Sequence, residues 1–322
     1  MNKIEKLLVG PKAIFKSRKL IKNLSSSLYQ YLILRKQNIE LKLRNGETII
    51  VSRFLYPRVI YYSKYIENMT KDGIYLKINN KAFQLPLKEI EILGFGNIIR
   101  LLKAGWLYYE NYWEKNNVKF KHLYYAIYDV FEEEDYKFLN VKDKNVLDIG
   151  AFVGDSAIYF ILKGAKKVYA IEPHPDTYNE MLENIKLNNI ENKIIPINMG
   201  ISYEKDYIFI NIKNLAQVAS SFFNSNNKVI RVSAGKLSDI IEKYNINAQI
   251  LKMDCEGCEY DIILKDYDTI KEFDEVGFEY HADKTKISVS KLLEKLNKDF
   301  ECRFVRESIS KDVGTIYCTR KR

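Results

Sequence analysis

The stretch VLDIGAFVGDS, residues 146–156, predicts a buried strand that runs into a glycine-containing turn and then a helix. Its first residues are apolar and partly β-branched, as expected for a parallel strand covered on both faces. Gly150 and Gly154 allow a tight bend that a bound ligand can approach closely. Asp155 or Ser156 can cap the helix that follows. This order of elements is typical of a nucleotide-binding domain.

The spacing of glycines and acids around this turn distinguishes between two cofactors. A second apolar strand, residues 167–172, ends on Glu172, an acid suitably placed for the ribose hydroxyls of either cofactor. A dinucleotide fingerprint would read G-x-G-x-x-G, but the glycines here read Gly150-x-x-x-Gly154. Asp148, inside the strand end, would repel a pyrophosphate but suits a cofactor with an ammonium and a sulfonium. The spacing favours S-adenosylmethionine, and NAD stays as a minor alternative.

Two signatures resemble those of the FkbM methyltransferase family. Residues 148–155 resemble the first motif of class I methyltransferases, and residues 164–175, GAKKVYAIEPHP, continue it in the manner of that family. Further along the chain, residues 251–260, LKMDCEGCEY, resemble the family's acidic D-x-E-G turn after a strand. The resemblance covers residues 135–320, and it depends on both signatures occurring in the right order.

The resemblance implies both a fold and a cofactor site. Residues 141–322 should form an α/β domain with a Rossmann-like class I methyltransferase sheet, mostly parallel with an antiparallel closing strand. Residues 1–140 should form a smaller, basic and aromatic-rich α+β domain. Glu172 would hold the ribose hydroxyls of S-adenosylmethionine, and Asp148 would favour its cationic end. The implied cofactor-binding residues are Asp148, Gly150, Ala151, Gly154, Asp155, Glu172, Asn198 and Gly200.

The reaction implied by the resemblance is methyl transfer to a hydroxyl oxygen. A hydroxyl is a poor nucleophile until its proton is removed, so the site requires a base. Asp254 and Glu256 are the first candidates, because they lie with Glu259 in an acidic turn where mutual repulsion raises at least one pKa. His281 is the second candidate, because it falls near the end of the next strand, where ligands gather in open α/β sheets.

The four cysteines predict neither a disulfide framework nor a metal site. Cys255 and Cys258 have the spacing of a redox or zinc pair. The other two, Cys302 and Cys318, are far apart in sequence, and no histidine lies near either pair. Cysteines that fill small spaces beside the acidic turn are the preferred interpretation.

Charge is distributed unevenly along the chain. Residues 1–140 hold 24 Lys and Arg and 14 Asp and Glu, a net charge of +10. Residues 141–322 hold the other 27 Lys and Arg and 28 Asp and Glu, a net charge of −1, and the whole chain carries +9. The basic part favours an anionic partner such as RNA, an acidic glycan or a lipid surface, although a solvated surface explains it equally well. No apolar run reaches the roughly 18 residues of a membrane span, so we expect a cytoplasmic protein. Peripheral association with a membrane stays open.

Three features of the N-terminal part predict local structure. Residues 12–36 carry apolar side chains at three- and four-residue steps, which predicts one amphipathic helix. Residues 39–51 alternate apolar and polar around Asn45-Gly46, a strong hairpin signal, and a further strand pair is expected between Gly73 and Leu87. The aromatic residues of 104–136 favour a core over a surface that stacks on sugars or bases.

The acceptor implied by the resemblance is a hydroxyl on a sugar, a glycan or a related small molecule. An RNA methyltransferase is the first alternative. The chain lacks the Asn/Asp-Pro-Pro-aromatic turn of enzymes that methylate base amino groups, because residues 254–257 read DCEG. A non-catalytic binding module that retains the fold is the second alternative, although the intact acids of both motifs speak against it. Assembly into a homo-oligomer stays open.

Overall fold

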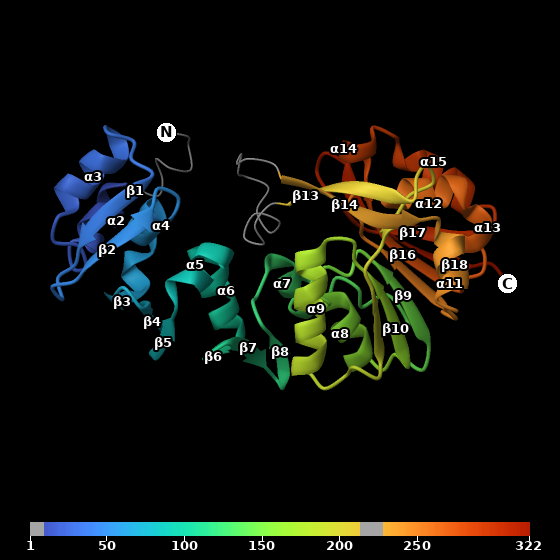
Figure 1. Ribbon diagram of the computed structural model, residues 1–322, viewed down its shortest axis with the longest axis horizontal. Helices are drawn as coiled ribbons and strands as arrows, with labels where there is room; N and C mark the ends of the chain where they lie inside the picture. The colour runs from blue at the N-terminus through green and yellow to red at the C-terminus, as the bar shows by residue number, and fades with distance from the viewer. Residues whose placement is uncertain (1–9, 213–227) are drawn as a thin grey trace. The chain divides into compact units, whose positions relative to one another are not determined.

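The computed structural model describes residues 10–212 and 228–322, which divide into two compact units (Figure 1). The first unit ends at Tyr125 and the second begins at Ala126, whereas the sequence places the boundary at residues 140 and 141. Helix α7 (Tyr125–Phe131) explains the difference, because the Phe131 ring packs edge-on against Tyr159 at 5.7 Å in the second unit. None of the helices in the described residues is long and apolar enough to cross a membrane.

The first unit combines short helices with small antiparallel sheets. Its helices are α2 (Pro11–Ser17), α3 (Leu24–Leu32), α4 (Leu55–Tyr62), α5 (Leu87–Leu93) and α6 (Phe95–Ala104). Its sheets are β1 (Asn38–Lys42) with β2 (Thr48–Ser52), β3 (Ile66–Met69) with β4 (Ile74–Ile78) and β5 (Lys81–Leu85), and β6 (Leu107–Tyr109) with β7 (Tyr112–Lys115) and β8 (Val118–Phe120). The predicted α+β class of this part is therefore confirmed.

Two local predictions in this unit are confirmed and one is wrong. The hairpin around Asn45-Gly46 is formed by β1 and β2, and the later strand pair by β4 and β5. The single helix over residues 12–36 is instead two helices. The chain between them pairs with the end of the hairpin, because the Lys22 N–H donates to the Lys42 carbonyl at 2.7 Å and Ile21 bridges Leu43. These backbone contacts replace the helical turn that apolar periodicity predicts.

The second unit contains the predicted sheet. Seven strands lie in the order β11-β10-β9-β15-β16-β18-β17. They are parallel from β11 to β16, and β18 is antiparallel to both of its neighbours, β16 and β17. The strands are β9 (Asn145–Ile149), β10 (Lys167–Ile171), β11 (Ile194–Ile197), β15 (Ile250–Met253), β16 (Glu275–His281), β17 (Phe300–Glu307) and β18 (Val313–Arg320). A separate small sheet joins β12 (Gly200–Ile201), β13 (Tyr207–Ile212) and β14 (Lys228–Gly235).

Helices cover both faces of the seven-stranded sheet (Figure 1). On one face lie α8 (Asp155–Leu162) and α9 (Pro175–Leu187); on the other lie α11 (Leu237–Lys243), α12 (Cys258–Lys265), α13 (Tyr267–Ile270) and α15 (Val289–Leu296). Leu147, Ile149, Leu251 and Met253 join the core under this second helical layer. Since side chains alternate along a strand, Asp148 and Lys252 point to the opposite face.

All four cysteines are paired by disulfides, so the prediction of no disulfide framework is wrong. Cys255 and Cys258 are joined within the acidic turn, where their Cα atoms are 5.5 Å apart. Cys302 and Cys318 are directly opposite each other on β17 and β18, with Cα atoms 4.0 Å apart. Their separation in sequence concealed this pairing, because only the antiparallel register of the last two strands brings them together.

We expect the disulfide between β17 and β18 to stabilise the sheet edge. Its loop spans a sequence separation of 16 residues. Removing such a crosslink by Cys302→Ala should lower the free energy of unfolding by about 3 kcal/mol, because the unfolded chain regains the entropy of the open loop. Urea unfolding without reductant measures this change. Four titratable thiols in the denatured wild-type protein would contradict the pairing itself.

Candidate active site

The turn after β9 packs directly against the end of β15. Gly150 has a φ of +79°, and a Cβ atom at this position would overlap the main-chain carbonyl of Asp254. Gly154 has a φ of +84° at the N-cap of α8, and a Cβ there would lie 2.9 Å from the Met181 side chain. Both positions therefore require glycine. This close approach brings the cofactor turn expected from the sequence against Asp254.

Beneath the turn lies a buried ion pair between neighbouring strands. Asp148 is fully buried and Lys252 is 2% exposed, with Lys252 Nζ 2.9 Å from Asp148 Oδ1. The Ser156 hydroxyl donates to Asp148 Oδ2 at 2.6 Å, and Lys252 Nζ donates to the Gly150 carbonyl at 3.0 Å. Burial acts to lower the pKa of Lys252, but the carboxylates of Asp148, Asp254 and Asp155 together outweigh it, so the pKa is raised. Lys252 therefore stays charged.

This pairing shows what holds Asp148 and adds a residue that the sequence prediction missed. Both carboxylate oxygens of Asp148 contact groups of the protein itself, and the predicted effect of Asp148 on the cationic end of the cofactor stays a prediction. Asp148 also holds Lys252, whose ammonium donates to the carbonyl of the cofactor turn. The signal for Lys252 was present in the sequence, as a single cation within the apolar strand ILKM of β15.

Glu172 lies at the end of β10 and is held by three donors. Its Oε1 accepts from the His174 N–H at 2.8 Å and from the Thr177 hydroxyl at 2.9 Å, and its Oε2 accepts from the Phe152 N–H at 2.9 Å. A carboxylate offers about four acceptor positions, so one remains for a ribose hydroxyl. The buried His174 Nε2 has no hydrogen-bond partner among the described residues. These groups fit the ribose of S-adenosylmethionine.

Cofactor affinity should depend on the titration of Glu172. Burial raises the pKa of Glu172 from 4.5 to about 7, against the effect of its three donors. The carboxylate accepts a hydroxyl more strongly than the acid does, so affinity for S-adenosylhomocysteine should fall by up to about tenfold per pH unit below that pKa. The stability of the ligand-free protein should change with pH in the opposite direction. The raised pKa of Glu172 lowers the free energy of unfolding above pH 7, and this loss disappears as the pH falls towards 4.5.

Calorimetric titrations between about pH 6 and pH 8 test the predicted dependence of cofactor affinity on pH. Glu172→Gln is the matched variant, because it keeps the size of the side chain but does not titrate. Its affinity for S-adenosylhomocysteine should be weaker and should lose the part of the pH dependence that Glu172 contributes, so that only a contribution from Asp155, whose pKa is also about 7, remains. A wild-type affinity with the same pH dependence as the variant would exclude Glu172 as the titrating contact.

The remaining cofactor-binding candidates differ in the contacts that hold them. Ala151 contributes its N–H to the Ile171 carbonyl at 3.0 Å, and Asp155 begins α8, where burial raises its pKa to about 7. Asn198 is exposed after β11, and its amide donates to the Glu172 carbonyl at 2.8 Å. A Cβ on Gly200 would overlap the Ile208 side chain. Packing of β12 on β13 therefore explains this glycine without a cofactor.

A pocket of about 180 Å³ opens at the carboxyl ends of β9 and β15. Its walls combine the cofactor turn with ionisable side chains from β15, β16 and β17. The lining residues are Ala126, Asp129, Val130, Asp135, Tyr136, Gly150, Phe152, Asp155, Ser156, Lys252, Asp254, Glu279 and Arg306.

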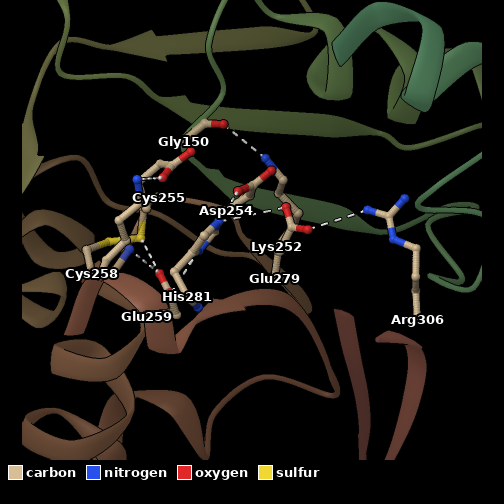
Figure 2. Close-up of polar contacts among 12 residues, drawn as sticks. Gly150, Lys252, Asp254, Cys255, Cys258, Glu259, Glu279, His281 and Arg306 are labelled. Atoms are coloured by element: carbon tan, nitrogen blue, oxygen red, sulfur yellow. Dashed lines mark hydrogen bonds and ion pairs between the residues drawn. A yellow bond between two sulfur atoms is a disulfide. The ribbon is translucent and has the colours of Figure 1, made fainter. Parts of the chain in front are cut away.

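Asp254 and His281, two of the three catalytic candidates, lie near each other (Figure 2), and Asp254 lines this pocket. His281 Nε2 lies 4.0 Å from Asp254 Oδ1 and 4.0 Å from Glu279 Oε2. On its other side, His281 Nδ1 lies 3.1 Å from Glu259 Oε1, which also accepts the His281 backbone N–H at 2.9 Å. The structure thus places an imidazole between a fully buried carboxylate and two carboxylates at the pocket.

The surrounding charges shift the pKa values of this group strongly. Burial acts to lower the pKa of His281, but the hydrogen bond and charge of Glu259, with Asp254 and Glu256, raise it to about 9. Burial also raises the pKa of Glu279 to about 7, and repulsion from Asp254 adds to the effect. In the ligand-free protein at neutral pH, His281 is therefore a cation that balances its acidic neighbours.

Glu256, the third catalytic candidate, lies outside this group. It adopts a φ of +58° in the turn, and its side chain is 69% exposed and 3.4 Å from Lys284 Nζ. Its position at the tip of the turn, away from the strand end, explains why sequence proximity to Asp254 does not become contact in space.

Sequence prediction missed three further residues of the site. Tyr136 donates its hydroxyl to Asp254 Oδ2 at 3.1 Å. Arg306 Nη2 donates to Glu279 Oε1 at 3.4 Å (Figure 2). Glu279 had a usable signal, because it lies two positions before His281 on β16 and so on the same face of the strand. Tyr136 and Arg306 come from either end of the domain and carry no local signal.

Comparison with known proteins identifies a family and several more distant similarities. The model of a family described as the methyltransferase FkbM domain matches residues 148–309, half of the chain. A tRNA (guanine(37)-N(1))-methyltransferase of Methanocaldococcus jannaschii is 48% identical over 52 residues, which are 16% of this chain and 15% of that protein. The match therefore spans less than a sixth of this curated relative.

Two solved structures are among those with a distant similarity to this chain. An O-methyltransferase from Bacillus cereus in complex with S-adenosylhomocysteine has a TM-score of 0.36 and 12% identity, over 55% of this chain and 74% of that one. The TYW2 protein of M. jannaschii in complex with S-adenosylmethionine has a TM-score of 0.34 and 16% identity, over 79% of this chain and 89% of that one.

Proposed function

The chain belongs to the FkbM methyltransferase family, and from this premise we propose that it methylates a hydroxyl oxygen on a sugar, a glycan or a related small molecule. It is an S-adenosylmethionine-dependent methyltransferase. The observation that carries the proposal is the position of Asp254, whose carboxylate lines the same pocket as Gly150 of the cofactor turn. A proton acceptor at this position suits an acceptor that must lose a proton as it is methylated.

In this reaction different residues would bind the cofactor and accept the proton. When bound, S-adenosylmethionine supplies an electrophilic methyl group. Glu172 accepts a ribose hydroxyl, and the turn from Gly150 to Gly154 bounds the amino-acid part of the cofactor. Asp254 accepts the proton of the acceptor hydroxyl while the new carbon–oxygen bond forms. The balanced products are a methyl ether, S-adenosylhomocysteine and a protonated Asp254, which returns its proton to water.

The Tyr136 hydroxyl would keep Asp254 in position, and Lys252 places a positive charge in the same pocket wall. The Tyr136 hydroxyl donates to Asp254 Oδ2, and burial raises the pKa of Tyr136 well above its usual value, so the phenol stays a donor. Lys252 is a buried cation two residues before Asp254, and it lines the same pocket. With the reacting groups already held in place, much of the acceleration would come from orientation and from exclusion of water.

RNA is the second candidate acceptor. The +10 charge of residues 1–140 and the short match to a tRNA methyltransferase favour it over other anionic partners. An RNA enzyme should bind RNA with an affinity that falls steeply as salt rises, because Lys and Arg displace counterions from phosphates. Weak binding of RNA even at low salt would remove this candidate and leave the hydroxyl of a small molecule or glycan.

Methyl-labelled S-adenosylmethionine tests the proposed reaction. The full chain is incubated separately with fractionated glycans, small hydroxylated metabolites and RNA, and the labelled products are identified by mass spectrometry. We expect label in an alkali-stable methyl ether on a sugar or small molecule. Label on nitrogen or carbon, or in RNA bases alone, would contradict O-methylation of such an acceptor while keeping the enzyme a methyltransferase.

A further inference from the structure

We propose that Asp254, Glu279 and His281 form a binding site for one divalent transition-metal cation, with Mn²⁺ as the probe of choice. The proposal rests on the proposed function, because the ion would act on the same acceptor hydroxyl. Each residue offers one atom, Oδ1, Oε2 and Nε2, and the three atoms lie within 4.8 Å of one another. Separations of 4.0 Å are too long for hydrogen bonds but leave room for an ion at about 2.0–2.5 Å from each.

The imidazole of His281 is oriented as a metal ligand would be. The residue is 5% exposed, and its Nε2 points between the two carboxylates without a hydrogen-bond partner among the described residues. Its Nδ1 is held at 3.1 Å by Glu259, which is fully buried. Histidines that bind metals typically donate their other ring N–H to a carboxylate in this way, which orients the ring. An ion at Nε2 would take the place of the proton that the imidazolium carries in the ion-free protein.

The two carboxylates are held in a corresponding way. Asp254 receives the Tyr136 hydroxyl on Oδ2 at 3.1 Å, and Glu279 receives Arg306 Nη2 on Oε1 at 3.4 Å. In each residue the oxygen that accepts this hydrogen bond is not the one near His281. The other oxygen, Oδ1 of Asp254 or Oε2 of Glu279, lies 4.0 Å from His281 Nε2 and could bind the ion. Three convergent atoms, each on a side chain fixed from behind, are the pattern expected of a metal site.

The donor atoms indicate the kind of ion and its use. One imidazole nitrogen with two carboxylate oxygens suits Mn²⁺ or Zn²⁺ better than it suits Ca²⁺, which prefers sites made of oxygen atoms alone. Because the cluster borders the pocket, positions opposite the three ligands are open to an acceptor. A cation there would bind the hydroxyl oxygen and lower its pKa. The O–H proton would pass to Asp254 Oδ2 as the oxygen takes the methyl group from sulfur.

Titration of the whole chain with Mn²⁺, followed by the electron paramagnetic resonance signal of the free ion, tests the site. After dialysis against a chelator, the wild type should bind one equivalent. Glu279→Gln and His281→Ala should each weaken binding by at least about tenfold. Glu256→Gln is the matched control, because it removes a nearby exposed acid outside the cluster and should bind Mn²⁺ as the wild type does.

Two results would overturn the metal site. One is no Mn²⁺ binding by the wild type at millimolar concentration, in which case the proton on His281 alone balances the carboxylates. The other is equal weakening by Glu279→Gln and Glu256→Gln, which would indicate diffuse attraction to acidic groups.

Methyl transfer is measured separately so that failure of the site and failure of the proposed function stay distinguishable. Stimulation of hydroxyl methylation when Mn²⁺ is restored to the chelated enzyme is the expected result. Equal rates with and without the ion would overturn its role in the reaction and leave O-methylation standing. Tight Mn²⁺ binding with methylation only of nitrogen or carbon would instead retain the site and overturn the proposed reaction.

Discussion

Asp254→Asn is expected to lower kcat for methyl transfer by about 10²- to 10⁴-fold, the usual contribution of a positioned general base. Asparagine keeps the size of the side chain and can still accept from Tyr136, but its amide cannot take the acceptor's proton. Affinity for S-adenosylhomocysteine should be retained, because the ribose contacts lie at Glu172, on another strand. Single-turnover kinetics with calorimetric binding of the product separates the two quantities.

Glu256→Gln is the control for this prediction. Glu256 is the neighbouring acid of the same turn, and its contact with Lys284 lies outside the pocket. Its activity should therefore stay close to that of the wild type. Full activity in Asp254→Asn, or equal losses in both variants, would remove Asp254 from the mechanism.

Lys252→Met is expected to lower the free energy of unfolding by about 3–5 kcal/mol, as for other buried ion pairs that lose one partner. The substitution leaves the Asp148 carboxylate buried without its cation, 2.9 Å from the position that Lys252 Nζ occupied. It also removes the donor to the Gly150 carbonyl, so cofactor affinity should fall with stability. Urea unfolding measures the first effect and calorimetry the second.

A double-mutant cycle with Asp148→Leu tests the cause of this loss. If the uncompensated charge is responsible, the double variant Asp148→Leu with Lys252→Met should recover most of the stability lost by Lys252→Met. Cofactor affinity should stay low in the double variant, because the donor to Gly150 is still absent. A loss below about 1 kcal/mol in the single variant, as for a solvent-exposed pair, would contradict the buried-pair account.

The fold of the second unit could be predicted because its signals are local. Residues 146–156 carry strand, turn and helix in one continuous pattern, and the second acidic signature lies at the end of another apolar strand. Together they fix two central strands and the edge at which their carboxyl ends meet. The hairpin at Asn45-Gly46 was predictable for the same reason, since its turn residues lie between two alternating segments.

The rest depends on contacts between residues distant in sequence. The two helices of residues 11–32 are separated because Lys22 pairs with the hairpin, and the register of β17 and β18 sets Cys302 opposite Cys318. The group around His281 likewise combines Asp254 from β15 with Glu279 from β16. In each case the sequence contains the residue types, but only the pairing of elements decides which of them meet.

Isothermal titration calorimetry of the wild-type chain with S-adenosylhomocysteine and with NAD tests whether the turn after β9, with Glu172 at the end of β10, binds S-adenosylmethionine. We predict binding of S-adenosylhomocysteine, none of NAD, and a marked loss of affinity in Glu172→Ala. Binding of NAD, or of neither ligand, would contradict the account of this site.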